Sequence, residues 1–78
     1  MKLYPNPQKI GATMEFRSNE AIESYSIMDP IGKRILDFAY ITPSNVGSFV
    51  MLLSQGQYLI RFTTVSGSVL FKQFQVIE

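Results

Sequence analysis

Residues 53–62, with the sequence LSQGQYLIRF, decide the fold class because a turn runs directly into a strand there. Gly56 suits a backbone position with positive φ, which costs glycine nothing because it has no side chain. Tyr58, Ile60 and Phe62 then alternate with more polar neighbours, and this period of two is typical of a half-buried β-strand. The pattern predicts a strand over 57–64.

The same alternation recurs along the chain and is interrupted by turn residues. The predicted strands cover 11–17, 21–28, 33–40, 46–53, 57–64 and 69–77. Ser18 can cap a helix over 18–28, but that segment has no apolar stripe at helical spacing, which favours a strand. Short strands at this spacing predict an all-β protein, a compact immunoglobulin-like antiparallel β-sandwich of about six to seven strands.

Turn residues mark the connections between these strands. Pro5 and Pro7 make a stiff corner, since each proline fixes its own φ and lacks a backbone donor, and Asn6 can close the corner on its own backbone. Asp29 can cap a β-turn over 29–32 that carries glycine at its fourth position, Gly32. Further turns or loops are predicted at 18–20, 42–45 and 66–68.

The alternation also predicts which side chains face the core. The predicted inward set is Met14, Phe16, Tyr25, Ile27, Val50, Leu53, Tyr58, Ile60, Phe62, Phe74 and Val76. Ile35 and Phe38 are the candidates for the inward face of strand 33–40, and their opposite parity requires a bulge or burial on both faces. In strand 69–77 the apolar residues change parity at 72–73, which predicts a β-bulge there.

Composition limits the possible functions. The chain has 78 residues and is predicted to be a single domain over 1–78, near the lower size limit for a self-sufficient core. It contains no cysteine and no histidine, which excludes disulfides, zinc sites of the Cys/His type and histidine-based catalysis. The net charge is +1 without a basic run, so neither nucleic acid nor an anionic membrane is favoured. The apolar run 49–53 is far too short to span a bilayer, so no membrane insertion is expected.

No catalytic motif is recognisable. Glu15, Glu20, Glu23 and Asp37 occupy predicted exposed positions, where solvated surface charge is a better interpretation than an acid–base pair. The serines have no histidine or lysine at a motif spacing, and the glycines form no phosphate-binding pattern. The chain is therefore predicted not to be an enzyme and to need no cofactor.

Tyr58 and Lys72 each allow two interpretations. Tyr58 either stacks on a ligand or packs in the core with its hydroxyl at the rim, and its alternation with core residues favours packing. Lys72 is either an exposed lysine that protects an edge strand from aggregation or a charge that a partner recognises. The residues alone favour the first role for Lys72.

Three motifs, in this order, resemble the C-terminal sorting domain of proteins exported by the type IX secretion system of Bacteroidetes (the Por secretion system C-terminal domain family). They are LYPNP at 3–7, YSIMDPIGK at 25–33 and LSQGQYLIR at 53–61, and the resemblance covers the whole chain. The chain departs from the family at Ser54, where proline is usual, and at Gln73, where a second lysine is common. It ends in Glu78, where many members have a basic residue.

The resemblance implies an immunoglobulin-like sandwich that is part of a larger secreted protein, fused behind an N-terminal cargo. It implies that the domain is a sorting signal, which the outer-membrane type IX translocon recognises after the protein has crossed the periplasm. A surface sortase of the cysteine-protease type would then remove the domain at a bond outside this chain, leaving the cargo secreted or on the cell surface. The candidate sorting-motif residues are Pro5, Asn6, Pro7, Asp29, Gly32, Lys33, Gly56, Tyr58 and Lys72.

The alternative is a β-sandwich module that binds carbohydrate or protein at the end of a secreted enzyme or adhesin. Such a module would need a row of exposed aromatic side chains, so at least three of Tyr4, Tyr25, Tyr40 and Tyr58 should be exposed on one face. The open edges of a small sandwich also allow an edge-to-edge or domain-swapped dimer.

Overall fold

The computed structural model describes residues 1–50 and 52–78, and all of their side chains except those of Gln8, Asp37 and Phe38. The predictions for the side chains of Asp37 and Phe38, and for Met51 within strand 46–53, lie outside this description. The described residues form no helix and six strands: β1 (Lys2–Tyr4), β2 (Gln8–Lys9), β3 (Thr13–Met28), β4 (Arg34–Val50), β5 (Gly56–Thr64) and β6 (Val69–Ile77).

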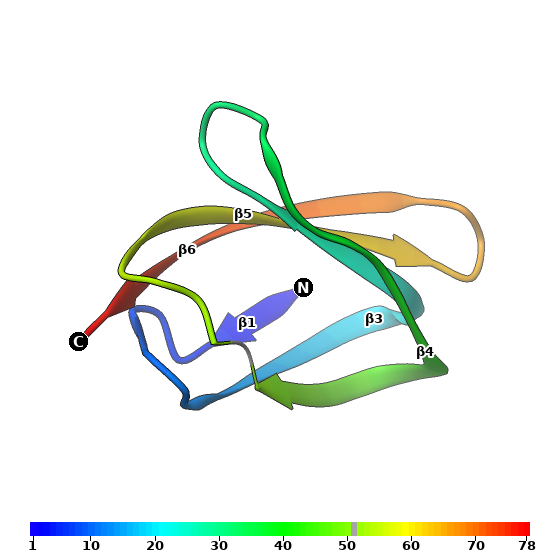
Figure 1. Ribbon diagram of the computed structural model, residues 1–78. Helices are drawn as coiled ribbons and strands as arrows, with labels where there is room; N and C mark the ends of the chain where they lie inside the picture. The colour runs from blue at the N-terminus through cyan, green and yellow to red at the C-terminus, as the bar shows by residue number, and fades with distance from the viewer. Residues whose placement is uncertain (51) are drawn as a thin grey trace.

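The six strands form one sheet that folds over into two layers (Figure 1). One layer contains β1, the first part of β3 and the last part of β4. The other contains the rest of β3 and β4, followed by β5, β6 and β2. Every pair is antiparallel except β2 with β6. The prediction of an all-β antiparallel sandwich of about six strands is confirmed.

The fold turns from one layer to the other at a corner where β3 and β4 bend together. The predicted turns at 18–20 and 42–45 are wrong as strand ends, because both strands continue through them. Four residues of β3 lie between the pairs Arg17–Val46 and Ile22–Ser44, opposite Asn45 alone.

The amide of Asn45 fills the gap that this irregular register leaves in the ladder. Its Nδ2 donates to the carbonyl oxygens of Ser18 at 3.1 Å and of Asn19 at 3.0 Å. Asn45 therefore occupies backbone acceptors that would otherwise lack a partner at the bend.

The core lies between the two layers. The buried apolar side chains are Met14, Phe16, Ile22, Ile27, Ile60, Phe62, Phe74 and Val76. Tyr25, Leu53 and Tyr58 from the predicted set are partly buried and pack against this core. Ile22 was absent from that set. It is buried because a register shift between Ile22 and Ser24 changes the parity of β3, so that Ile22 and Tyr25 both reach the core.

Two residues predicted to face inward do not. Val50 is 57 % exposed, because it pairs with Thr13 while its neighbour Phe49 pairs with the buried Met14. Phe49 takes the inward place instead and stacks on Tyr25, with ring centroids 4.8 Å apart. The predicted inward orientation of Ile35 is also wrong, since its side chain is 42 % exposed.

The bulge predicted at 72–73 is also wrong. The register between β5 and β6 runs without a break from the pair Gly56–Val76 to the pair Thr63–Val69. The apolar residues change parity without a bulge because Val69 and Phe71 face away from the core and are exposed to solvent. Lys72 consequently shares its face of β6 with Phe74 and Val76.

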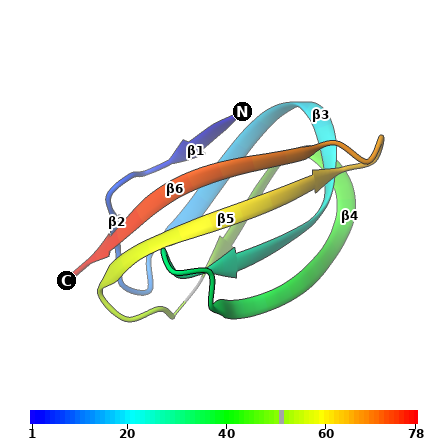
Figure 2. The ribbon, with the colours of Figure 1, turned by 90° about the horizontal axis from the view of Figure 1, so that it is seen from above.

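Residues 2–9, which we call the N-terminal strap, close one open side of the sandwich. β1 pairs with β3 in one layer, and the chain then crosses to β6, which β2 joins at Val76 and Ile77. Figure 2 shows the strap lying beside β6 on the side away from β5. The edge of β6 ahead of this contact pairs with no described strand, and the edge-to-edge or domain-swapped dimer stays a prediction.

Candidate functional site

The Pro5–Asn6–Pro7 corner ties the strap to β6. Asn6 does not close a turn on its own backbone. Its Nδ2 donates to the carbonyl oxygen of Gln73 at 3.3 Å, and its Oδ1 accepts from the backbone N–H of Gln75 at 3.2 Å. The carboxamide of Asn6 thus pairs with the β6 edge as a backbone peptide group would, just ahead of β2.

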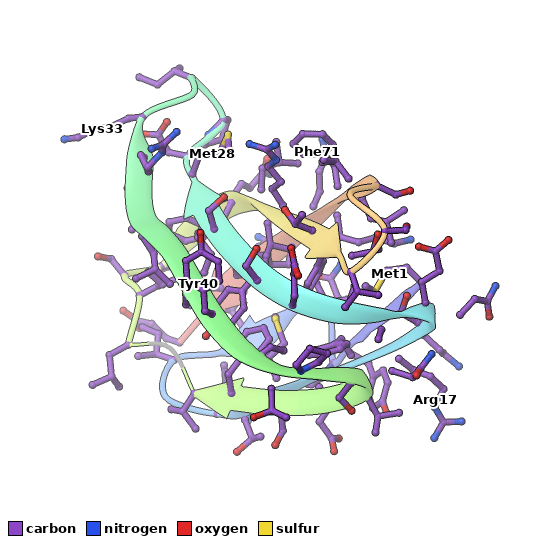
Figure 3. All side chains as sticks on the ribbon, turned by 90° about the vertical axis from the view of Figure 1, so that its right-hand side faces the viewer. Met1, Arg17, Met28, Lys33, Tyr40 and Phe71 are labelled. Atoms are coloured by element: carbon purple, nitrogen blue, oxygen red, sulfur yellow. The ribbon has the colours of Figure 1, made fainter. Side chains whose placement is uncertain are left out.

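The predicted turn at 29–32 is confirmed and projects from the sandwich as the tip of the β3–β4 hairpin (Figure 1). The N–H of Gly32 donates to the carbonyl oxygen of Asp29 at 3.0 Å, and Gly32 has a φ of +89°. Oδ1 of Asp29 accepts from the N–H groups of Ile31 at 3.1 Å and Lys33 at 2.8 Å. These bonds fix the tip, which presents an Ile31 that is 89 % exposed and a Lys33 that points away from the sheets (Figure 3).

Gly56 and Tyr58 open β5 next to the strap. Gly56 has a φ of +156°, a conformation that other residues rarely adopt. The hydroxyl of Tyr58 donates to the carbonyl oxygen of Ser54 at 2.7 Å, and its ring stacks on Phe74 with centroids 5.6 Å apart. Tyr58 therefore packs in the way the alternation favoured, with its ring against the core and its hydroxyl at the rim.

Lys72 lies in the middle of β6, opposite the buried Ile60 of β5. The Lys72 side chain is half-buried, so the prediction of an exposed lysine at this position is wrong. Lys72 occupies the core-facing parity of an edge strand, a placement that discourages pairing with another sheet edge. It forms no ion pair or hydrogen bond with the side chains that the structure describes.

Folding brings parts of the three sequence motifs to one hollow of about 310 Å³. It is lined by Asn6 from the strap, Pro30 from the hairpin tip, Gln57, Tyr58 and Leu59 from β5, and Gln73, Phe74 and Gln75 from β6. We call this hollow the amide groove. Of the candidate sorting residues, Asn6 and Tyr58 line it. The other candidates are not among its described lining residues: Pro5, Pro7, Asp29, Gly32, Lys33, Gly56 and Lys72.

The three glutamines of the amide groove were missed by the sequence reasoning. Gln57 pairs with Gln75 across β5 and β6, and Gln73 lies two residues from Gln75 on the same strand. Their alternation with Tyr58, Phe74 and Val76 already placed them on the outer face. Nothing in the sequence indicated that Pro30 and Asn6, which are far from the glutamines in the chain, would lie beside this face.

The titratable side chains of the described residues, apart from Tyr58, lie outside the amide groove. No cluster of three or more acidic, histidine or cysteine side chains among them could hold a metal ion. Glu20 accepts a hydrogen bond from the hydroxyl of Ser66 at 2.8 Å. Burial raises the pKa of the Tyr25 phenol, whose ring lies among Phe49 and Phe62. No helix that could cross a membrane occurs in the described part of the chain.

The exposure of the tyrosines tests the alternative of an aromatic binding face. Tyr40 is 78 % exposed and lies on β4 facing solvent (Figure 3), whereas Tyr4, Tyr25 and Tyr58 are each partly buried. The sequence criterion required at least three exposed tyrosines on one face. It is not met, and the described surface has no tyrosine platform for a carbohydrate.

Comparison with known proteins identifies one family. The sequence profile described as secretion system C-terminal sorting domain matches residues 2–77, which is nearly the whole chain. No curated protein matches the sequence significantly.

Proposed function

The chain belongs to the family of type IX secretion system C-terminal sorting domains, and from this premise we propose that it is a non-enzymatic address for an N-terminal cargo protein. In this proposal the outer-membrane translocon of the type IX system recognises the folded domain after the fusion has crossed the periplasm. A surface sortase then separates the domain from the cargo, which is released or remains on the cell surface.

One observation carries the proposal that a folded surface is recognised. The three motifs are spread over most of the chain, yet each contributes a residue that a specific contact fixes on the sandwich. Asn6 pairs with the edge of β6, Asp29 closes the hairpin tip, and Tyr58 packs on Phe74 beside both. These contacts hold surface segments in a defined arrangement, which suits residues that a partner recognises.

Lys72 is the most specific candidate for a recognised charge. The test fuses the chain to a reporter delivered to the periplasm of a type IX-competent cell, and reporter on the surface or in the medium is measured by immunoblotting with protease accessibility. Lys72→Met keeps an unbranched stem of similar length on the half-buried side and removes only the charge. We expect export to fall while the melting temperature of the purified domain stays close to that of the parent.

Lys2→Met is the matched control, because Lys2 is an exposed lysine on β1 and not a sorting candidate. Its export should equal that of the parent fusion. Export that survives Lys72→Met would show that the lysine is not read, while the folded surface could still be the address. A parent fusion that stays in the periplasm while a competent control domain is exported would refute the sorting function itself.

A further inference from the structure

The outer face of the β5–β6 pair carries unused hydrogen-bonding capacity inside the amide groove. Each glutamine side chain offers a carbonyl acceptor and two N–H donors. The side chains of Gln57, Gln73 and Gln75 form no hydrogen bond within the described part of the chain. Asn6, by contrast, already uses its carboxamide on the backbone of β6. The groove thus exposes three neighbouring carboxamides between two walls.

The spacing of these carboxamides matches an extended polypeptide. Gln73 and Gln75 project from the same face of β6 two residues apart, which in a β-strand is a separation of about 7 Å. An extended peptide turns equivalent N–H and C=O groups to the same side at the same repeat. A strand laid along β6 over the groove would therefore offer one peptide group to Gln73 and one to Gln75, and Gln57 lies beside Gln75 on β5.

The chemistry of the lining selects against charged ligands. None of the described residues that line the groove is charged, and Pro30 and Leu59 add apolar surface beside the carboxamides. A charged group placed there would lose water without gaining an opposite charge. An uncharged segment can exchange its hydrogen bonds with water for bonds to the glutamines.

A carbohydrate would also offer uncharged donors and acceptors, but the groove lacks the flat aromatic surface that suits a sugar ring. Among the described residues of the lining, Tyr58 and Phe74 are the only aromatic ones, and their rings stack on each other toward the core. The exposed Tyr40 is not among the lining residues. The observations favour a peptide.

We propose that the amide groove is a binding site for an extended, uncharged peptide segment of a partner protein, held between the hairpin tip and the N-terminal strap by Gln57, Gln73 and Gln75. The inference goes beyond the sorting function, because it concerns binding by the isolated chain and assigns the site through its chemistry. Because Pro30, Asn6 and the glutamines come from separate parts of the chain, the site exists only in the folded domain.

The test measures binding of the purified chain to an array of end-blocked octapeptides. One half of the array contains only Ser, Thr, Asn, Gly and Val, and the other half alternates these with Glu or Lys. We expect binding to members of the uncharged half, with shifts of the side-chain amide NMR signals of the three glutamines. Replacing Gln73 and Gln75 together by Met should weaken the best of these peptides about 25-fold, or about fivefold for each lost hydrogen bond.

Gln55→Met is the matched control, since Gln55 is an exposed glutamine outside the lining, and its affinity should equal that of the parent. Thermal melting checks that the double variant is folded. The proposal is overturned if no uncharged peptide binds, if binding survives the double substitution, or if the charged half binds preferentially. Binding of maltohexaose, used as the carbohydrate probe, in place of peptides would overturn it in favour of a sugar site. None of these outcomes depends on export.

Discussion

At the scale of single residues, Gly47 shows how a small side chain makes room in a small core. Gly47 lies opposite Phe16 in the β3–β4 ladder, and the buried Phe16 ring covers it. A methyl group at this position would lie 2.5 Å from Cε2 of Phe16 and 2.7 Å from its Cζ. From the sequence Gly47 only weakened a predicted strand, whereas in the structure it permits the packing of the ring.

Gly47→Ala should therefore destabilise the protein by about 1–3 kcal/mol, because the Phe16 ring must move within a closely packed core. Urea unfolding monitored by circular dichroism measures the loss. Ser48→Ala, an exposed neighbour on the same strand, should change the free energy of unfolding by no more than about 0.5 kcal/mol. Equal stabilities of the two variants would mean that the ring does not lie over Gly47.

Because of Tyr25, the free energy of unfolding should decrease as the pH rises into the alkaline range. Burial raises the pKa of its phenol above the ordinary value, so the folded state holds this proton more tightly than the unfolded state. The stabilisation that the protonated Tyr25 phenol contributes is complete below the pKa of the unfolded state, about 10. It is lost as the pH rises through the higher pKa of the folded state.

The urea midpoint should consequently fall between about pH 9 and about pH 11, and it should fall less in Tyr25→Phe, which keeps the ring but cannot ionise. The two proteins differ only in the phenolic hydroxyl of residue 25, so the difference between the two curves isolates Tyr25. Parallel curves would contradict the assignment of the buried phenol.

At the scale of elements, alternation and turn residues predicted the strands well but not their continuity. β5 and β6 begin and end within one residue of the predicted ranges, because their inward and outward sides alternate regularly. The predicted turns at 18–20 and 42–45 are the bend of two long strands, where bulges keep the ladder paired. A local pattern cannot distinguish a chain reversal from a bulged corner, since both use small polar residues and proline.

The candidate site was predictable only in part for the same reason. The residues of each motif were recognisable from the sequence, and so was the outward face of Gln57, Gln73 and Gln75. The contact of Asn6 with β6 joins residues that are 67 and 69 positions apart, and no local pattern indicates such a pairing.

The attachment of the N-terminal strap to β6 should depend on Asn6. Asn6→Leu removes both hydrogen bonds to β6, so we expect a loss of about 1–2 kcal/mol and faster hydrogen exchange at the backbone amide of Gln75, which donates to Asn6. Exchange at the amide of Phe62, in the middle of β5, serves as the internal reference. If the amide of Gln75 exchanges at the parent rate while that of Phe62 is unchanged, the pairing of β1 and β2 holds the strap without Asn6.

At the scale of the whole molecule, parts of the three sequence motifs meet at the amide groove only because the sandwich is folded. Ile60 of β5 is fully buried in the core and is not among the residues that line this groove. Ile60→Ala should cost about 2–5 kcal/mol, a large part of the roughly 5–15 kcal/mol that stabilises a small domain. The variant therefore separates the need for the fold from the need for particular surface residues.

If the translocon reads the folded surface, export of the Ile60→Ala fusion should follow its folded fraction. Export should fall steeply at growth temperatures near the melting temperature of the variant and return to the parent level at lower temperature, where the same surface is restored. Circular dichroism of the purified variant at each temperature gives the folded fraction, and the exported reporter is measured by immunoblotting. Lys72→Met should behave differently, with low export at every temperature, because its fold is intact and the recognised charge is missing. Parent-level export of Ile60→Ala at temperatures where the domain is unfolded would show that the machinery reads a linear sequence.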